Sequence, residues 1–185
     1  MPNARHLNAR EWMRAVLERY EGPLVRYAAR ITGDLERGRD VAQETFLRLW
    51  RFSGEVGADH LAQWLFTVCR NRALDVRRKE GRMRRLTDRA AAGVVGREPG
   101  PLALIERHEA AQAALEALAS LPDNQQEVIR LRLQEGFSYR QISGITGLTV
   151  SNVGFLIHVG MKRIREQLRA WGLAPGGVGR AADGD

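Results

Sequence analysis

A run of basic side chains between residues 70 and 89 is the strongest chemical signal in the sequence. It holds nine Lys or Arg residues against three Asp or Glu, a formal charge of +6, whereas the whole chain carries +7. Clustered cations with few acids among them are typical of a surface that binds nucleic-acid phosphates. A merely solvated helix face is the alternative, but it predicts more interspersed acids. We therefore expect this stretch to bind nucleic acid.

A second signal, between Tyr139 and Leu156, is the pattern of a helix-turn-helix. Ser143 is a small residue that lets two helices cross closely, and Gly147, four residues later, tolerates the positive φ of the turn. Apolar residues fit the inner faces of both helices: Ile142, Ile145, Leu148, Val153 and Leu156. The alternative is a plain helical hairpin in a bundle.

The second helix of this motif would enter the major groove by its N-terminal end. The residues expected to face the DNA there are Thr149, Ser151, Asn152, Phe155 and His158, with Lys162, Arg163 and Arg165 further along to hold phosphates. The segment from Val153 to Met161 is unusually apolar for base contacts, which favour Arg, Asn, Gln or Lys. The apolar residues Phe155, Ile157 and Val159 predict either packing on the module's own core, which we favour, or a protein-contact surface.

Helices must position both signals, and Gly and Pro residues divide the chain into helical segments. We expect an all-α fold of two small helical domains, residues 1–89 and 105–171, joined by a flexible Gly- and Pro-rich linker over 90–104 and followed by a disordered tail over 172–185. The expected helices cover residues 9–20, 23–31, 34–52, 59–85, 102–119, 122–136, 138–146 and 150–171. Gly22-Pro23 is expected to separate the first two, and Asp34, Asp59 and Ser138 are expected N-caps.

Several classes of function are disfavoured by what the sequence contains. Cys69 is the single cysteine, so no internal disulfide is expected, and the four histidines His6, His60, His108 and His158 lack metal-ligand spacing. We expect no metal and no cofactor. The apolar runs are far shorter than a membrane span and the N-terminus lacks a signal-peptide core, so we expect a cytoplasmic protein without membrane insertion. An enzyme such as a nuclease would need Mg²⁺ at Asp34, Asp40 and Glu44, which nothing else in the sequence supports.

Two segments of the first domain carry a resemblance to a known family: Asp40–Trp50 and Trp64–Lys79. They resemble conserved region two of the extracytoplasmic-function sigma factors of bacteria, a group of the RNA polymerase sigma factor family. Leu121-Pro122, the segment Gln126–Leu133 and the helix-turn-helix are similar to region four of the same family. The resemblance covers residues 10–85 and 105–170, in the family's order and with a linker between.

The resemblance implies roles for residues of the first domain. One surface would dock on the clamp helices of core RNA polymerase: Asp40, Gln43, Glu44, Phe46 and Leu47. The loop Ser53–His60 would capture bases of the melted promoter, and Trp64 would stack on such a base, since an extruded base needs a pocket. Phosphates near the minus-ten element would contact Arg70, Arg72, Arg77, Arg78 and Lys79. Alternatively Phe46, Leu47 and Trp50 are mostly core, and for Trp64 we favour a core role.

The function implied is that of an alternative sigma factor, which binds core RNA polymerase through its clamp helices and flap, directs it to promoter DNA and assists melting. It would have no catalytic residues and would be regulated by an anti-sigma factor. Gly154, Leu156 and Val159 depart from the family pattern, which usually has basic residues there. The alternative function is a stand-alone helix-turn-helix transcription regulator, which would leave Asp40–Trp50 and the basic stretch unexplained.

Overall fold

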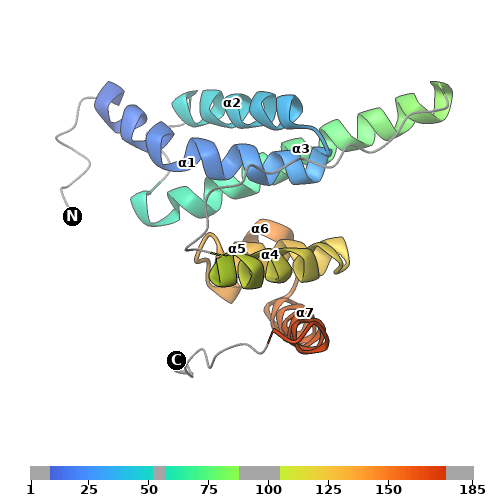
Figure 1. Cartoon of the computed structure of the whole chain (residues 1–185). Coiled ribbons are helices and arrows are strands. Elements are labelled where there is room, and N and C mark those ends of the chain that lie inside the picture. Colours follow the sequence, from blue (N-terminus) through green and yellow to red (C-terminus); the bar gives the residue numbers. More distant parts are fainter. Residues whose placement is uncertain (1–8, 52–56, 88–104, 174–185) are drawn as a thin grey trace. The chain divides into compact units, whose positions relative to one another are not determined.

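The computed structural model describes residues 9–51, 57–87 and 105–173. Within these ranges the chain forms seven α-helices and one short 3-10 turn and contains no strand (Figure 1). The prediction of an all-α fold is confirmed. The expected linker over 90–104 and the tail beyond residue 173 lie outside the described residues. The chain divides into two compact units, which we describe separately.

The first unit consists of α1 (Ala9–Thr32), α2 (Leu35–Arg51), the 3-10 turn η1 (Ala58–His60) and α3 (Leu61–Thr87). Each of the three α-helices packs against the other two. Their shared core contains Tyr27 and Phe66, whose ring centroids lie 5.2 Å apart. This core holds α2 and α3, the two helices with predicted binding residues.

Helix α1 is continuous from Ala9 to Thr32 and has Pro23 in its interior, so the predicted break at Gly22-Pro23 is wrong. Proline removes one backbone hydrogen bond and clashes with the preceding turn, at a cost of about 3 kcal/mol. Buried residues lie on both sides of Pro23: Met13 and Val16 before it, Leu24 and Tyr27 after it. Because both halves bury apolar side chains in one core, packing offsets the local cost of the proline.

The ends of the first unit's helices follow the predicted capping chemistry in one case and depart from it in another. The backbone N–H of Arg37 donates to Asp34 Oδ1 at 2.9 Å, so Asp34 caps α2 as expected, directly after Gly33 at φ 77°. Asp59, in contrast, lies inside η1, and α3 begins at Leu61. The expected N-cap at Asp59 is therefore wrong, because the chain inserts a tighter turn before the helix.

The second unit contains α4 (Ile105–Ala119), α5 (Asp123–Leu133), the start of α6 (Tyr139–Thr146) and α7 (Val150–Ala170). Helices α4 and α5 both pack on α7. Gly160 makes this close packing possible, because a Cβ there would lie 2.6 Å from Ile129 Cδ1 on α5. Pro122 is the N-cap of α5, one residue earlier than the predicted first-turn position.

The turn between α6 and α7 has the predicted helix-turn-helix geometry. The two helices are bent by 105° relative to each other, within the range of this motif and far from a hairpin. Gly147 has φ 76°, and Ser138 and Gln141 form a reciprocal capping box, with Ser138 N–H donating to Gln141 Oε1 at 2.9 Å and Gln141 N–H to Ser138 Oγ at 3.3 Å. Four of the five predicted inner residues are buried (Ile142, Ile145, Val153 and Leu156) and Leu148 is half-buried.

Candidate DNA-binding and docking surfaces

The outward face of α2 is more apolar than predicted. Asp40 and Gln43 are exposed, as expected. Leu47 and Trp50 are 54% and 51% exposed, so the alternative that they belong mostly to the core is wrong for both, and the position of Leu47 agrees with the predicted docking surface. Phe46 is 8% exposed, so the core alternative is correct for it and its predicted place on the docking surface is not. Exposed large apolar side chains beside polar ones are typical of a protein-contact surface rather than of a solvated helix.

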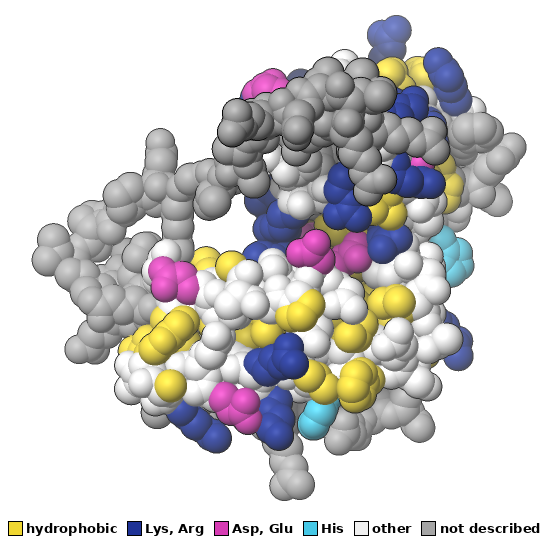
Figure 2. Space-filling view, turned by 90° about the vertical axis from the view of Figure 1, so that its right-hand side faces the viewer, with side chains coloured by type: hydrophobic (Ala, Val, Ile, Leu, Met, Phe, Trp, Pro, Cys, Tyr) yellow, Lys and Arg dark blue, Asp and Glu magenta, His cyan; other side chains and the backbone are white. Residues whose placement is uncertain are grey.

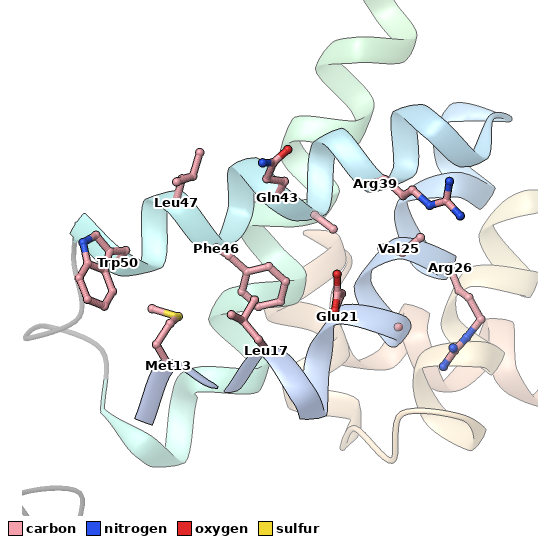
Figure 3. A pocket seen from close by; sticks show the side chains of 12 residues that line it. Met13, Leu17, Glu21, Val25, Arg26, Arg39, Gln43, Phe46, Leu47 and Trp50 are labelled. Atoms are coloured by element: carbon pink, nitrogen blue, oxygen red, sulfur yellow. The ribbon is translucent and has the colours of Figure 1, made fainter. Parts of the chain in front are cut away.

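Gln43, Phe46, Leu47 and Trp50 line a groove of about 720 Å³ between α1 and α2, whereas Asp40 lies outside its lining (Figure 3). Figure 3 shows Met13, Phe46 and Trp50 around one end and Arg26 and Arg39 at the other. The groove is therefore apolar along most of its length and basic at one end. The sequence analysis did not predict this groove, because its walls come from two helices whose crossing cannot be read from the sequence.

The crossing itself depends on Gly38. A Cβ at this position would lie 2.8 Å from both the Cβ and the backbone nitrogen of Ala29 and 2.9 Å from the carbonyl oxygen of Val25. Two of these three atoms are backbone, which cannot move aside. Only a residue without a side chain lets α2 approach α1 this closely, and the groove between them takes its shape from that approach.

Glu44 lies beside α3 and pairs with a residue of that helix. Arg72 Nε donates to Glu44 Oε2 at 2.5 Å, and Arg48 Nη2 donates to Glu44 Oε1 at 3.3 Å. The side chains of Glu44 and Arg72 are only 36% and 28% exposed. Glu44 was predicted to bind polymerase and Arg72 to bind DNA phosphates, yet here they satisfy each other. A second α2–α3 ion pair joins Arg37 to Glu80.

The other cations that were predicted to bind DNA from α3 do not share one face. Arg77, Arg78 and Lys79 are exposed and Arg70 is half-buried. At 100° per residue, Arg70 and Arg77 lie on one side of the helix, and Arg72 and Lys79 lie on nearly the opposite side. Arg78 Nη2 also donates to Asp75 Oδ1 at 2.6 Å. The sequence placed all of these cations correctly on one helix, but its geometry divides them between two surfaces.

Trp64 is half-buried, between the two roles considered for it. Of the loop expected to capture bases, residues 53–56 lie outside the described residues, whereas Gly57, Asp59 and His60 are exposed. The side chain of Trp64 thus combines a packed part with an accessible part near the start of α3.

The expected DNA-facing residues of α7 all lie at the surface. Ser151, Asn152, His158, Lys162 and Arg163 are exposed, and Phe155 is 63% exposed. Thr149 is exposed too, but its hydroxyl accepts from the Asn152 backbone N–H at 3.2 Å, so it is the N-cap of α7. The expected packing of the apolar residues on the core holds for Ile157, at 8%, and is wrong for Phe155.

Figure 2 shows Lys and Arg gathered over α1–α3 and more hydrophobic surface over α4–α7.

A second groove, of about 400 Å³, lies between α4, α5 and α7 and was also missed by sequence reasoning. Its lining is mostly apolar and includes Leu115, Leu133 and Met161, with Leu133 63% exposed. Arg130 Nε is buried there without a hydrogen-bond partner, and burial lowers the pKa of Arg130. The groove thus offers apolar contact and one unsatisfied cationic donor.

The described ranges contain neither a cluster of metal-binding side chains nor a single helix that could span a membrane. No three His, Cys, Asp or Glu side chains in them lie together as a metal site would require. None of the described helices is by itself long and apolar enough to cross a bilayer, although α6 and α7 together meet the length and composition criteria as a bent pair.

Comparison with known proteins gives matches in both units. A model of Sigma-70 region 2 matches residues 16–83, and a model of Sigma-70, region 4 matches residues 111–164. The ECF RNA polymerase sigma factor SigL of Mycobacterium tuberculosis is 32% identical over 166 residues, which are 87% of this chain and 91% of the relative. The ECF RNA polymerase sigma factor EcfG of Rhodopseudomonas palustris is 33% identical over 128 residues, 69% of this chain and 68% of the relative.

Two solved structures have a similar fold. The sigma factor RpoE of Bartonella quintana, in complex with the anti-sigma factor NepR, superposes with a TM-score of 0.68 at 27% identity and covers 86% of this chain and 98% of its own. CnrH, in complex with the cytosolic domain of CnrY, gives a TM-score of 0.57 at 22% identity over 88% of this chain and 91% of its own. The latter likeness concerns the fold alone.

Proposed function

Because this chain belongs to the extracytoplasmic-function (ECF) sigma factors of the RNA polymerase sigma family, we propose that its two units have separate roles in directing core RNA polymerase to promoters. The chain is an alternative sigma factor. One observation supports this division of roles. The first unit has a basic helix beside an exposed apolar face, and the second has a helix-turn-helix. It acts in the cytoplasm as a regulatory subunit, and the polymerase supplies all catalysis.

The first unit would dock on the clamp helices through the exposed face of α2. Leu47 and Trp50 supply apolar contact, and Asp40 and Gln43 supply polar contacts at its margin. Large exposed apolar side chains dominate the binding energy of such interfaces. Glu44 is assigned to the α2–α3 contact instead, because Arg72 and Arg48 already bind it.

The exposed cations of α3 would hold phosphates near the minus-ten element, and Trp64, at the start of the same helix, would stack on a captured base. Helix α7 would enter the major groove of the upstream element with Ser151, Asn152, Phe155 and His158 toward the bases and Lys162 and Arg163 toward phosphates. These assignments are supported by exposure and by position on each helix.

The groove between α4, α5 and α7 suits the polymerase flap. Its apolar lining and its single unsatisfied donor, Arg130 Nε, fit an apolar helix with one acidic residue. Since the similar sigma factor RpoE of Bartonella quintana was solved in complex with the anti-sigma factor NepR, we also propose that an anti-sigma factor regulates this chain by covering polymerase-docking surfaces. The two kinds of partner would then exclude each other.

Run-off transcription with core polymerase and genomic templates tests the function. We expect promoter-specific starts that depend on this chain. A Leu47→Ser variant should bind core polymerase about tenfold more weakly, whereas Leu35→Ser, at another exposed apolar position of α2 (38% exposed) outside the groove, should bind normally. No specific start, together with tight duplex binding in the absence of polymerase, would favour the stand-alone regulator instead.

A further inference from the structure

One continuous line of exposed side chains runs along α7. Ser151, Phe155, His158 and Lys162 follow one another at intervals of four, three and four residues, so they lie on one face of the helix. We call these four residues the α7 stripe. The opposite face is buried through Val153, Leu156, Ile157, Gly160 and Ile164. The stripe is therefore the face that α7 presents outward from its own unit.

Phe155 is the one large apolar residue of the α7 stripe, and it lies in its N-terminal half. It is 63% exposed, while its neighbours Leu156 and Ile157 are 6% and 8% exposed. The core of the unit is thus complete without the Phe155 ring. The exposed ring of Phe155 therefore calls for a role other than packing.

The chemistry of the first turns of α7 is unusual for DNA recognition. From Val150 to Met161 the helix contains no Lys, Arg, Asp or Glu. Guanine is normally read by Arg or Lys at its O6 and N7, and cytosine by an acidic acceptor at its N4, so this segment lacks the side chains for both. It does contain Asn152, whose amide matches adenine N6 and N7, and Phe155, whose ring matches the one apolar group in the major groove, the 5-methyl of thymine.

We propose that the α7 stripe recognises A·T base pairs through their thymine methyl groups, with Phe155 as the specificity-determining contact. The inference rests on the proposed function, in which α7 enters the major groove. Past Phe155 the outward face carries three exposed cations, Lys162, Arg165 and Arg169, and one acid, Glu166, which lies 3.9 Å from Lys162. Its net charge is positive. Cations on the same face as the ring fit a DNA backbone flanking the bases that the ring contacts. This complementarity is the reason for assigning DNA, not a protein, to the Phe155 surface.

The experiment uses holoenzyme assembled from core polymerase and the full chain, on a promoter located by run-off transcription. Each thymine of the upstream element is replaced in turn by uracil, which keeps base pairing and removes only the 5-methyl group. Wild-type holoenzyme should bind about fourfold more weakly at one or two of these positions, the factor expected for one buried methyl group. A Phe155→Ala variant should bind more weakly on thymine DNA and show no further loss on uracil DNA.

Two controls keep the result interpretable. Trp171→Ala removes another exposed aromatic, 48% exposed, at the far end of α7, and should keep the full sensitivity to uracil. Thermal unfolding of Phe155→Ala should match the wild type, because its ring is outside the core. Phe155→Leu, which keeps an apolar side chain, should retain part of the sensitivity to uracil.

The outcomes separate the inference from the proposed function. Promoter-specific starts that are indifferent to uracil in the upstream element would overturn the inference and leave the sigma function intact. Loss of transcription by Phe155→Ala with no uracil effect would overturn it too, and would assign Phe155 to a protein partner. No promoter-specific start by the wild type would contradict the proposed function itself, and the inference with it.

Discussion

Between α2 and α3 of the first unit, ion pairs join the helices, whereas between α5 and α7 of the second an apolar contact around a glycine does so. Glu44 and Glu80 bind Arg72 and Arg37 between α2 and α3. The crossing of α5 and α7 brings Gly160 against the apolar end of Ile129 on α5 and that of Leu121, which lies just before α5. In α7 the ion pair Lys162–Glu166, 3.9 Å long, stays within one helix.

The difference matters for DNA binding. Part of the cationic charge of α3 is engaged by carboxylates of its own unit, so binding to phosphates competes with internal pairs and falls with added salt. The α7 stripe has an aromatic ring where most base-reading helices have a cation. We therefore expect the first unit to supply salt-sensitive affinity and the second to supply salt-tolerant selectivity.

The largest expected loss of folding stability comes from substitutions at the two glycines where helices cross, Gly38 and Gly160. Gly38→Val should destabilise the first unit by about 3 kcal/mol or more, because the added atoms meet backbone of α1. Gly160→Ala should cost the second unit only about 1 kcal/mol, since the Ile129 Cδ1 that it meets ends a flexible side chain. Urea unfolding monitored by circular dichroism measures both.

Gly22→Ala is the control for that pair, because it adds a methyl group on α1 only 3.1 Å from the mobile end of Arg26. It should leave stability unchanged or raise it by about 0.5 kcal/mol, as expected for replacing a helical glycine. Equal losses for Gly38→Val and Gly160→Ala would contradict the contrast between a backbone-limited and a side-chain-limited crossing.

Alkaline pH should weaken the first unit through Cys69. Burial raises the pKa of Cys69 from 9.0 to about 12, against a smaller lowering by its hydrogen bond with Thr45. The unfolded thiol ionises above pH 9 while the folded one keeps its proton, so this stability is complete below pH 9 and is lost between pH 9 and 12. The loss approaches about 1.4 kcal/mol per pH unit. Cys69→Ala should remove this part of the pH dependence, and a slope unchanged by the substitution would contradict the assignment.

The sequence predicted features that depend on local chemistry. The caps at Asp34 and Ser138, the turn at Gly147 and the inner face through Ile142 and Val153 need only neighbouring residues, and they were correct. The continuation of α1 through Pro23 was not predicted. Packing of both halves of the helix in one core outweighs the local cost of a proline inside a helix, and only that local cost can be read from the sequence.

The candidate site was predicted less completely than the fold. Residue types identified α2, α3 and α7 as the functional helices, but not which side chains would bind each other. The Glu44–Arg72 pair spans 28 positions of the chain, so no local pattern announces it. The exposure of Leu47, Trp50 and Phe155 likewise depends on how each helix is rotated about its axis against its neighbours. A period of 3.6 residues predicts that rotation only to within about one residue.

Thr149, the N-cap of α7, could serve promoter binding in two ways. Its hydroxyl could hold the helix in position, or its methyl group could contact a base. Thr149→Ala should cost about 1 kcal/mol, because the Asn152 backbone N–H loses its acceptor. Thr149→Ser keeps the hydroxyl and should keep both stability and promoter binding. If Thr149→Ser bound promoter DNA as poorly as Thr149→Ala at full stability, the Thr149 methyl group would be a base contact instead.

The smallest expected effect is on DNA affinity, and it tests whether Glu44 competes with DNA phosphates for Arg72. Glu44→Gln should release Arg72 from its carboxylate partner and strengthen binding of the free chain to non-specific DNA by about two- to fivefold. The salt dependence should steepen as well, by about 0.9 in the slope of log K against log salt if Arg72 gains one phosphate contact. Fluorescence anisotropy with a labelled duplex at several salt concentrations measures both quantities.

Glu36→Gln is the matched control for Glu44→Gln. It removes the same charge from the same helix, but the ion-pair partner of Glu36 is Arg39, on α2 itself. A general gain in positive charge would strengthen DNA binding equally in both variants, whereas release of Arg72 does so only in Glu44→Gln. In an Arg72→Ala background Glu44→Gln should have no more effect than Glu36→Gln. Equal effects of the two substitutions in the wild-type background would show that Glu44 acts through net charge and that the ion pair does not restrain α3.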